Sequence, residues 1–314
     1  MADKVLTVAL NPSIDKTVVV ERLQPYGLNR VLQSESDPGG KGINAARVLH
    51  SFGAEVALTG FLAGSTGKML AESLQAEGLS CDFLEIPGQT RINLKVFDRS
   101  AKKTTEINER GCAVAAGDLA RLEARFKALC RDARLVVLSG SLPPGVPDDI
   151  YARLIKTAKA AGAAAILDAD GEALRKGVRG IPYAVKPNIH ELSALAGRPL
   201  KTARDALNAG RELTARGVRI VIVSMGADGA VALDGREAFQ ADPWKISVQS
   251  ATGAGDSMVG ALADALLRGA VLADIARVTT AAGTVTASKP GTRLCTKAEV
   301  MESLRLVDVH PMDS

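Results

Sequence analysis

The sequence predicts an α/β protein with a mostly parallel central sheet, helices on both faces of that sheet, and a small additional β-sheet. Short apolar runs alternate along the chain with stretches of helix length, and this alternation is typical of βαβ units in a parallel sheet. Two segments, at about 12–37 and 90–110, interrupt the alternation. They predict the small sheet.

Six apolar runs are expected to form the parallel strands. They are Val5–Leu10, Val56–Phe61, Leu135–Leu138, Ala163–Asp168, Ala184–Lys186 and Ile220–Ser224, and a helix-length stretch follows each of them. Three predicted helices end at a glycine, which readily takes the left-handed conformation of a C-terminal cap. These helices are Ile43–Phe52, Gly67–Glu77 and Tyr151–Ala161. The final residues, 309–314, are expected to fray.

The segment from residue 90 to residue 108 predicts a β-hairpin, because two alternating runs flank a polar turn at 98–100. On its first strand, one face holds Ile92, Leu94 and Val96, and the other face holds Arg91, Asn93 and Lys95. Strands here could join the parallel sheet only through long crossovers. We therefore expect a separate sheet that forms a lid, inserted into one domain that spans residues 1–314.

Composition and charge exclude several classes of protein. The 314 residues include 39 Lys+Arg and 35 Asp+Glu, a net charge of +4, which is too balanced for a nucleic-acid-binding face. No run of about 18 apolar residues suggests a membrane span, and the start, Met1–Val8, resembles a strand and not a signal sequence. Four cysteines without CxxC spacing predict neither disulfides nor a zinc site. We expect a soluble cytoplasmic protein.

Three known motifs are excluded by their spacing. Gly64–Met69 resembles a P-loop but lacks its first glycine and its final Ser or Thr. Gly253–Met258 resembles a dinucleotide fingerprint, but the third glycine falls at position 260. His190 and Glu191 begin a zinc-protease string, but Ala194 occupies the position of its second histidine.

Two glycine clusters open predicted helices, at Pro38–Asn44 and Ser250–Ser257. Free backbone N–H groups at a helix start, lined by glycine, can approach a phosphate or a sugar closely. The second cluster also places the carboxylate of Asp256 beside such groups, and phosphoryl transfer needs oriented donors and a carboxylate that takes the hydroxyl proton. A tight turn explains the first cluster equally well, and an ordinary helix cap explains Asp256 equally well.

Together with the predicted lid, five strings resemble the ribokinase-like, PfkB-type carbohydrate kinases over essentially the whole chain. They are Gly39–Ala46, Ser139–Pro143, Lys186–Asn188 with Glu191, Ser224–Ala230 and Gly253–Ser257. Within that family, three further strings are most similar to those of 1-phosphofructokinases, with tagatose-6-phosphate kinases as the nearest relatives. They are Leu10–Asp15, Thr90–Lys95 and Thr105–Asn108.

The resemblance implies roles for residues at matching positions. The residues implied to bind the phosphosugar are Asp15, Gly39, Gly40, Lys41, Asn44, Arg91 and Ser139. Those implied to bind the nucleotide are Lys186, Asn188, Ser224, Gly226, Gly229, Ser250 and Thr252, with Glu191 binding Mg²⁺ through water. The implied catalytic residues are Gly253, Ala254 and Gly255 as an anion hole and Asp256 as the general base.

Chemistry agrees with these roles, because the phosphate of a sugar needs cations such as Arg91 and Lys41. Surface charge explains both cations without a ligand, and an exposed helix position does the same for Glu191. Asp168 ends a predicted strand, where it can either meet a ligand or cap the next turn.

The resemblance implies an ATP-dependent, Mg²⁺-assisted kinase that converts fructose 1-phosphate into fructose 1,6-bisphosphate. The alternatives are tagatose 6-phosphate or fructose 6-phosphate as acceptor, a non-catalytic sugar-phosphate sensor, and a dinucleotide oxidoreductase. A monovalent cation near Thr252 stays open, because a lysine stands in the Lys289–Gly291 loop. Strands near Thr17–Val20 and Ile92–Val96 are expected to expose apolar faces and free edges, which predicts a homodimer formed through the lid.

Overall fold

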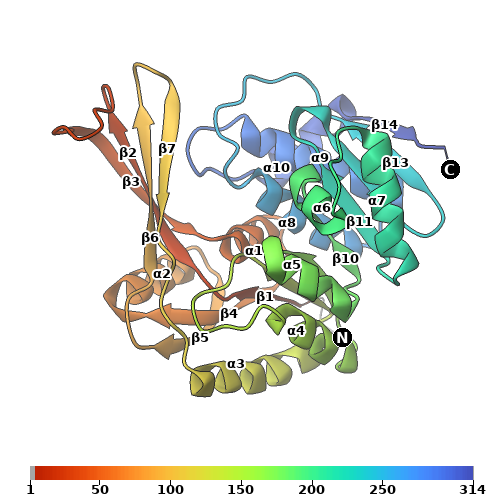
Figure 1. The fold of residues 1–314 in the computed structure, drawn as a ribbon, viewed down its shortest axis with the longest axis horizontal. Coiled ribbons are helices and arrows are strands. Elements are labelled where there is room, and N and C mark those ends of the chain that lie inside the picture. The colour runs from red at the N-terminus through yellow and green to blue at the C-terminus, as the bar shows by residue number, and fades with distance from the viewer. Residues whose placement is uncertain (1–3, 314) are drawn as a thin grey trace.

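A large α/β body carries a small projecting β-sheet (Figure 1). The computed structural model describes residues 4–313, so the first three residues of the expected N-terminal strand and Ser314 lie outside the described part. No helix within residues 4–313 is long and apolar enough to cross a membrane.

The central sheet of the body runs in the order β14-β13-β12-β11-β10-β9-β8-β1-β4-β5. Neighbouring strands from β5 to β11 are parallel, and the last three pairings, from β11 to β14, are antiparallel. The strands are β1 (Val5–Ala9), β4 (Val56–Ala63), β5 (Ser80–Ile86), β8 (Leu135–Ser139), β9 (Ala164–Asp168), β10 (Ala184–Val185), β11 (Ile220–Ser224), β12 (Ala230–Leu233), β13 (Ala238–Asp242) and β14 (Asp308–Pro311).

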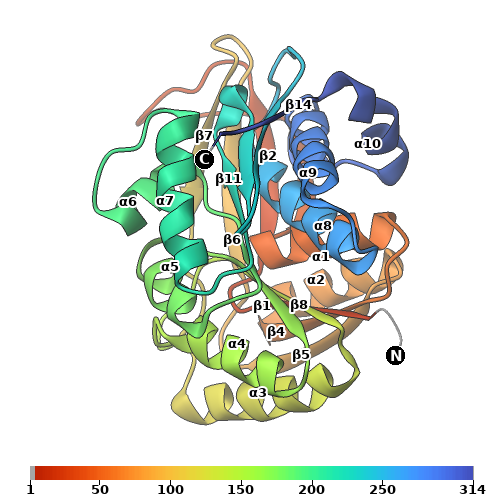
Figure 2. The same cartoon turned by 90° about the vertical axis from the view of Figure 1, so that its right-hand side faces the viewer.

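Helices cover both faces of this sheet, as Figure 2 shows. One face packs against α3 (Ala116–Leu129), α4 (Ile150–Ala160), α5 (Gly171–Gly177), α6 (Ile189–Ala196) and α7 (Ala203–Ala215). The other face packs against α1 (Lys41–Ser51), α2 (Gly64–Ala76), α8 (Ala254–Leu267), α9 (Leu272–Ala287) and α10 (Lys297–Ser303). Successive strand residues enter opposite cores, which is why the strands read as continuous apolar runs. The predicted fold class is confirmed.

All six predicted strands are present, but the expectation of a helix after Ile220–Ser224 is wrong. The chain reverses at Met225–Gly229 and returns as β12, with the Met225 amide donating to the Gly229 carbonyl oxygen at 2.8 Å. Gly226 and Gly229 both have positive φ angles, of 63° and 79°. Glycine takes this conformation without strain, so the chain can reverse within residues 225–229. This turn leaves no room for a crossover helix between β11 and β12.

Of the C-terminal residues expected to fray, 309–311 belong to a strand, β14, and Ser314 lies outside the described residues. β14 pairs with β13 in antiparallel register, with Asp308 opposite Asp242 and Pro311 opposite Phe239. The sequence of this short edge strand carries little apolar signal, because only Val309 is partly buried and its other residues are exposed.

The lid is a four-stranded sheet in the order β3-β2-β6-β7. Its strands are β2 (Ser13–Val20), β3 (Val31–Gly39), β6 (Arg91–Asp98) and β7 (Lys103–Asn108). The predicted hairpin is β6 and β7, and β2 lies parallel to β6 with Asp15 opposite Asn93. Alternation along β2 and β6 places Asp15, Asn93 and Lys95 on one face of the sheet.

The apolar face of the lid is not exposed as the sequence suggested. Val18, Val20 and Val96 are each at most 7% exposed and pack against one another in a small cluster of their own. Exposed apolar side chains lie instead near the β2–β3 connection and on the two edge strands, at Tyr26, Leu28, Val31, Leu32 and Ile107.

Candidate active site

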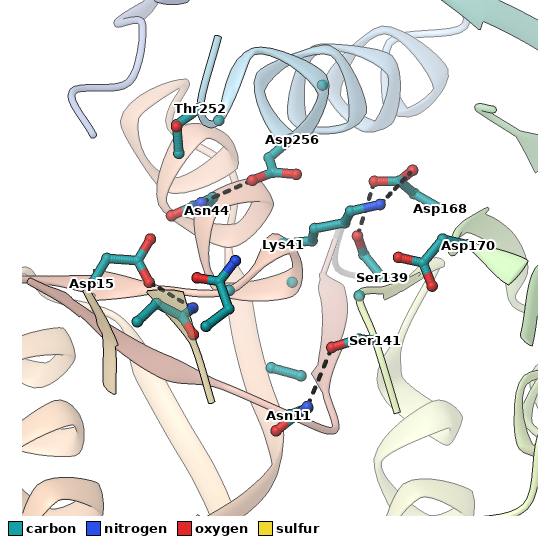
Figure 3. A pocket seen from close by; sticks show the side chains of 18 of the residues that line it. Asn11, Asp15, Lys41, Asn44, Ser139, Ser141, Asp168, Asp170, Thr252 and Asp256 are labelled. Atoms are coloured by element: carbon teal, nitrogen blue, oxygen red, sulfur yellow. Dashed lines mark hydrogen bonds and ion pairs between the residues drawn. The ribbon is translucent and has the colours of Figure 1, made fainter. Parts of the chain in front are cut away.

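A cavity of about 650 Å³ lies where the lid meets the carboxyl ends of the central strands and the first turns of α1 and α8 (Figure 3). Ligands of open α/β sheets bind at this end of the strands. Most of the predicted site residues line it: Asp15, Gly40, Lys41, Asn44, Arg91, Ser139, Lys186, Asn188, Glu191, Ser224, Thr252, Gly253, Gly255 and Asp256.

Five predicted site residues do not line the cavity: Gly39, Gly226, Gly229, Ser250 and Ala254. Two of these glycines permit close packing. A Cβ on Gly39 would lie 2.3 Å from Oδ1 of Asp15, and one on Gly229 would lie 2.1 Å from the carbonyl oxygen of Ala241. Ser250 acts on the loop itself, because its Oγ accepts from the Thr252 amide at 3.2 Å.

Asp256 is buried at the start of α8 and does not cap that helix. Gly253 is the N-cap, with a left-handed φ of 79°, and no side-chain cap hydrogen bond is present at this helix start. The Asp256 carboxylate instead accepts a hydrogen bond of 2.8 Å at Oδ2 from Nδ2 of Asn44 on α1. The alternative that Asp256 is an ordinary helix cap is therefore wrong.

The hydrogen bond between Asn44 and Asp256 depends on the close packing of α1 against α8. One turn beyond them, Gly260 lies against Val48, and a Cβ at position 260 would stand 2.7 Å from Cγ1 of Val48. A contact that short does not occur between real side chains. The missing side chain at Gly260 lets the two helices approach, and this approach brings the amide of Asn44 to the carboxylate.

The pKa of Asp256 is raised from its ordinary value to about 6. Burial is the largest cause, and the nearby charge of Asp168 adds to it. The hydrogen bond from Asn44 and the charges of Lys41 and Lys186 act in the opposite direction, because they favour the ionised form. The helix start alone suggests a favoured carboxylate, but burial outweighs it. A carboxylate with a pKa near 6 is ionised at neutral pH and basic enough to accept a proton.

Two lysines and two carboxylates form a charged group beside Asp256. The Nζ atom of Lys186 lies 3.3 Å from Oδ1 of Asp168, and that of Lys41 lies 3.9 Å from the same oxygen and 3.6 Å from Oε1 of Glu191. Burial lowers the pKa of Lys41, but Asp168, Glu191 and Asp256 together raise it above its ordinary value. In Figure 3, Lys41 points toward Asp168 and away from Asp15. Its ammonium therefore lies beside Asp168 and Glu191, not beside Asp15 of the lid.

Asp168 lies at the centre of this group. The sequence left open whether Asp168 meets a ligand or caps the next turn. It is 1% exposed, and its Oδ2 accepts from Oγ of Ser139 at 3.1 Å. Its Oδ1 makes no hydrogen bond within residues 4–313. Asp168 lines the cavity and does not cap a turn, and its Oδ1 lies at salt-bridge distance from the ammonium groups of Lys41 and Lys186.

Asn188 and Glu191 begin helix α6 as a capping box. Oδ1 of Asn188 accepts from the amides of His190 and Glu191, and Oε2 of Glu191 accepts from the Asn188 amide at 2.9 Å. Oε1 of Glu191 stays on the cavity side, near Lys41. Glu191 thus has a structural role as well as a position in the cavity.

On the lid side of the cavity, Asp15 forms a buried ion pair with Lys95. The Lys95 Nζ lies 2.8 Å from Oδ2 of Asp15. Oδ1 of Asp15 accepts from Oγ of Ser13 at 2.8 Å and from Nδ2 of Asn93 at 3.1 Å. The implied sugar-binding carboxylate is therefore held in one orientation by three donors.

Arg91 connects the lid to the body through carbonyl groups. Its guanidinium donates to the Asn11 carbonyl at 2.9 and 3.2 Å and to the Glu109 carbonyl at 3.0 Å. No carboxylate within residues 4–313 lies at salt-bridge distance from it, whereas Lys95 and Lys186 each have one and Lys41 has two. Burial lowers the pKa of Arg91, against the opposing effects of Asp15 and Glu109. Arg91 thus lines the cavity without a close ion-pair partner among the described residues, although Asp15 and Glu109 act on it from farther away.

Several residues that line the cavity were not among the predicted site residues: Asn11, Asn93, Lys95, Glu106, Asn108, Ser141, Asp168 and Asp170. Strict alternation on β6 was the signal for Asn93 and Lys95, because these residues share the polar face with Arg91. The ammonium of Lys289, in the loop where a monovalent cation was left open, donates to the Leu294 carbonyl oxygen and to Glu299.

The arrangement combines a buried carboxylate, two glycine-rich helix starts, and several cationic side chains that line one cavity. Such a site can stabilise charge on a transferred phosphoryl group while a carboxylate takes up a proton. Comparison with known proteins agrees, because the model of the pfkB family of carbohydrate kinases matches residues 8–299. The chain belongs to the pfkB carbohydrate kinase family.

Individual members of the pfkB family are similar over most of the chain. Two 1-phosphofructokinases are each 39% identical to it: that of Xanthomonas campestris pv. campestris, covering 90% of both chains, and that of Rhodobacter capsulatus, covering 90% of this chain and 89% of the relative. Phosphofructokinase-2 from Escherichia coli, solved in complex with fructose-6-phosphate, has a TM-score of 0.89 and 32% identity, covering 97% of this chain and 98% of that one. The predicted family and the predicted kinase class are confirmed.

Proposed function

We propose that this pfkB-family kinase transfers the γ-phosphoryl group of ATP to the free primary hydroxyl of fructose 1-phosphate, giving fructose 1,6-bisphosphate and ADP. The observation that carries the proposal is the position of Asp256. Its buried carboxylate lies at a glycine-rich helix start, in the same cavity as Arg91, which has no close ion-pair partner among the described residues. The similarity to the two 1-phosphofructokinases supports the choice of acceptor.

In the proposed reaction, Asp256 takes the proton of the primary hydroxyl as the hydroxyl oxygen attacks the γ-phosphorus atom. The bond from that phosphorus to the oxygen of the leaving ADP breaks, and the negative charge spreads over the equatorial oxygens. The first turn of a helix leaves N–H groups without partners inside the helix, and those at the start of α8 would face this charge. The Ala254 amide donates to the Ala251 carbonyl at 3.4 Å, so that bond would have to give way for Ala254 to take part. The ammonium groups of Lys41 and Lys186 lie on the same side and favour the same charge.

The cavity fits a Mg²⁺ ion that arrives with the nucleotide. No group of three His, Cys, Asp or Glu residues within residues 4–313 is placed to hold a metal ion, and Mg²⁺ usually combines one or two carboxylates with substrate phosphates and water. Asp168 and Glu191 would hold it, since Asp168 has a buried oxygen without a hydrogen bond and Oε1 of Glu191 faces the cavity. Bound there, the ion would neutralise charge on the nucleotide phosphates.

The acceptor phosphate is proposed to lie at Arg91. A guanidinium binds phosphate through paired hydrogen bonds, and no carboxylate among the described residues lies at salt-bridge distance from Arg91. The phosphate end of the sugar would then lie at the lid, and its free hydroxymethyl end would reach Asp256.

The test is a coupled assay of ADP release with fructose 1-phosphate, fructose 6-phosphate, tagatose 6-phosphate and fructose as acceptors. We expect the highest kcat/KM for fructose 1-phosphate. Preference for fructose 6-phosphate would replace the proposal with a 6-phosphofructokinase, which the similarity to the Escherichia coli enzyme makes the second candidate. Equal or better turnover of fructose would overturn a phosphosugar site altogether. Binding of phosphosugars without any ADP release would indicate a sensor.

A further inference from the structure

The lid contributes to the cavity three buried polar residues whose joint role the proposed mechanism does not explain. Asp15 on β2 and Asn93 on β6 are opposite each other in the strand register, and Lys95 follows Asn93 on the same face. All three are at most 9% exposed and all three line the cavity. We call them the lid cluster.

The charge of Lys95 is already matched within the lid cluster. Its Nζ lies 2.8 Å from Oδ2 of Asp15, and both side chains are less than 10% exposed. Buried charges are stable only when they are paired in this way. The pair is neutral as a unit, so it does not favour a phosphate dianion, and Arg91, without a close ion-pair partner among the described residues, is the better phosphate site.

The lid cluster keeps hydrogen-bonding capacity that the described part of the chain does not fill. An ammonium group has three donors, and Asp15 is the one acceptor for Lys95 within residues 4–313. Nδ2 of Asn93 donates to Oγ of Ser13 and to Oδ1 of Asp15, while Oδ1 of Asn93 is buried without a partner among the described residues. Buried polar groups normally have partners, so the cluster lacks one that a ligand can supply.

The family resemblance already implies that Asp15 binds the sugar. We propose that Lys95 is a further specificity-determining residue, which donates a hydrogen bond to the hydroxyl next to the one that Asp15 accepts from. A hydroxyl is both donor and acceptor. A vicinal diol therefore matches a donor and an acceptor whose heavy atoms lie 2.8 Å apart. Lys95 then selects a ring hydroxyl, whereas Arg91 selects the phosphate. This inference rests on the proposed function and adds the diol to it.

The test compares fructose 1-phosphate with its 3-deoxy and 4-deoxy analogues, using the wild-type protein and the variant Lys95→Gln. The wild type should lose about 10- to 100-fold in kcat/KM on at least one analogue, because a charge-assisted hydrogen bond is missing. In Lys95→Gln, kcat/KM for fructose 1-phosphate should fall to near the level of that analogue. The preference for the hydroxyl then disappears, while KM for ATP is unchanged.

The matched control is Lys16→Gln. Lys16 lies on β2, next to Asp15 in sequence. Lys16 is exposed and points away from the cavity, so its variant should keep the wild-type preference. Lys95→Gln leaves a buried carboxylate without its cation and can destabilise the lid. The double variant Asp15→Asn/Lys95→Gln removes both charges, and it should melt near the wild-type temperature and also lack the preference.

Two outcomes would overturn the inference. If Lys95→Gln loses activity equally on all three sugars and keeps the wild-type preference, the lysine is structural. If it loses affinity for inorganic phosphate and keeps the preference, the lysine is a phosphate ligand. The proposed function fails separately, when the wild type does not phosphorylate fructose 1-phosphate. The same comparison is then made with the acceptor that it does phosphorylate and the deoxy analogues of that acceptor.

Discussion

Nδ2 of Asn44 donates a hydrogen bond of 2.8 Å to Oδ2 of Asp256, and this bond joins helices α1 and α8 across 212 positions of the sequence. Asn44 follows the glycine cluster that begins α1, and Asp256 follows the one that begins α8. The bond fixes the orientation of the carboxylate and favours its ionised form. Both glycine-rich helix starts thus act on one carboxylate, which leads to the first three predictions.

Asp256→Asn should lower kcat by at least about 100-fold, because a general base is lost while shape and hydrogen bonding are kept. The KM values for ATP and the phosphosugar should change little. Steady-state kinetics checks this, with Asp274→Asn as control. Asp274 is also the third residue of its helix, but it is exposed and does not line the cavity. Near-normal turnover of Asp256→Asn would require a different base.

The rate should fall in acid with a midpoint near pH 6, because protonated Asp256 cannot accept a proton and its pKa is raised to about 6. Asn44→Ala removes a hydrogen bond that favours the carboxylate, so the midpoint should move to higher pH. Sugar phosphate titrates at about pH 6 as well, and the difference between the variant and the wild type separates the two. Identical pH profiles would show that Asn44 does not tune the base.

The ionised Asp256 carboxylate should also lower the free energy of unfolding at neutral pH. Its pKa is higher in the folded protein than in the unfolded chain, so the folded state binds the proton more tightly between about pH 4 and 6. The free energy of unfolding therefore falls as pH rises through this window. Asp256→Asn should be more stable than the wild type at pH 8, by up to about 3 kcal/mol, and should gain nothing near pH 4. Denaturant unfolding at the two pH values measures the difference.

Arg91→Ala should raise KM for the phosphosugar by about tenfold or more, because a charge-assisted hydrogen bond is lost, and leave KM for ATP nearly unchanged. Arg91→Lys should rescue only part of the loss, since an ammonium cannot reach the carbonyls of Asn11 and Glu109 and a phosphate together. Arg99→Ala, at the exposed hairpin turn of the lid, is the control. A parallel rise in KM for ATP would show a general loss of the lid.

The protein should form a homodimer through the lid, with a mass of about twice the 32.7 kDa of one chain. β3 and β7 are the free edges of the lid sheet, and exposed Val31 and Leu32 lie on β3. Such edges are usually covered. Light scattering at micromolar concentration measures the mass, and Leu32→Glu should shift it toward the monomer. A monomeric wild type would contradict the prediction.

Sequence patterns predicted the elements whose local signal is strong. The parallel strands are buried on both faces and read as apolar runs, and the lid hairpin alternates because one face is polar. The antiparallel return after Ile220–Ser224 was missed, because the reversal depends on two glycines whose conformation the sequence does not state. β14 was missed because its pairing with β13 is a contact between distant segments.

In the site, the resemblance located most of the lining residues, but not their partners. Lys41 was expected beside the sugar phosphate and lies beside Asp168 and Glu191. Asp256 was expected to be favoured as a carboxylate by its helix, and burial has the larger effect on its pKa. Both differences arise from side chains that approach from elements distant in sequence, and spacing along one segment does not contain that information.

The hydrogen at Cα of Gly260 stands where any other residue would place its Cβ atom, and this has a consequence for the whole active site. Asn44 and Val48 are one helical turn apart on α1, and so are Asp256 and Gly260 on α8, so the two contacts are successive steps of one interface. A wedge at the lower step, 2.7 Å from Val48, would spread the helices and lengthen the upper step. The distance between the Asp256 carboxylate and the Asn44 amide thus depends on the lack of a side chain at Gly260, a residue that does not line the cavity.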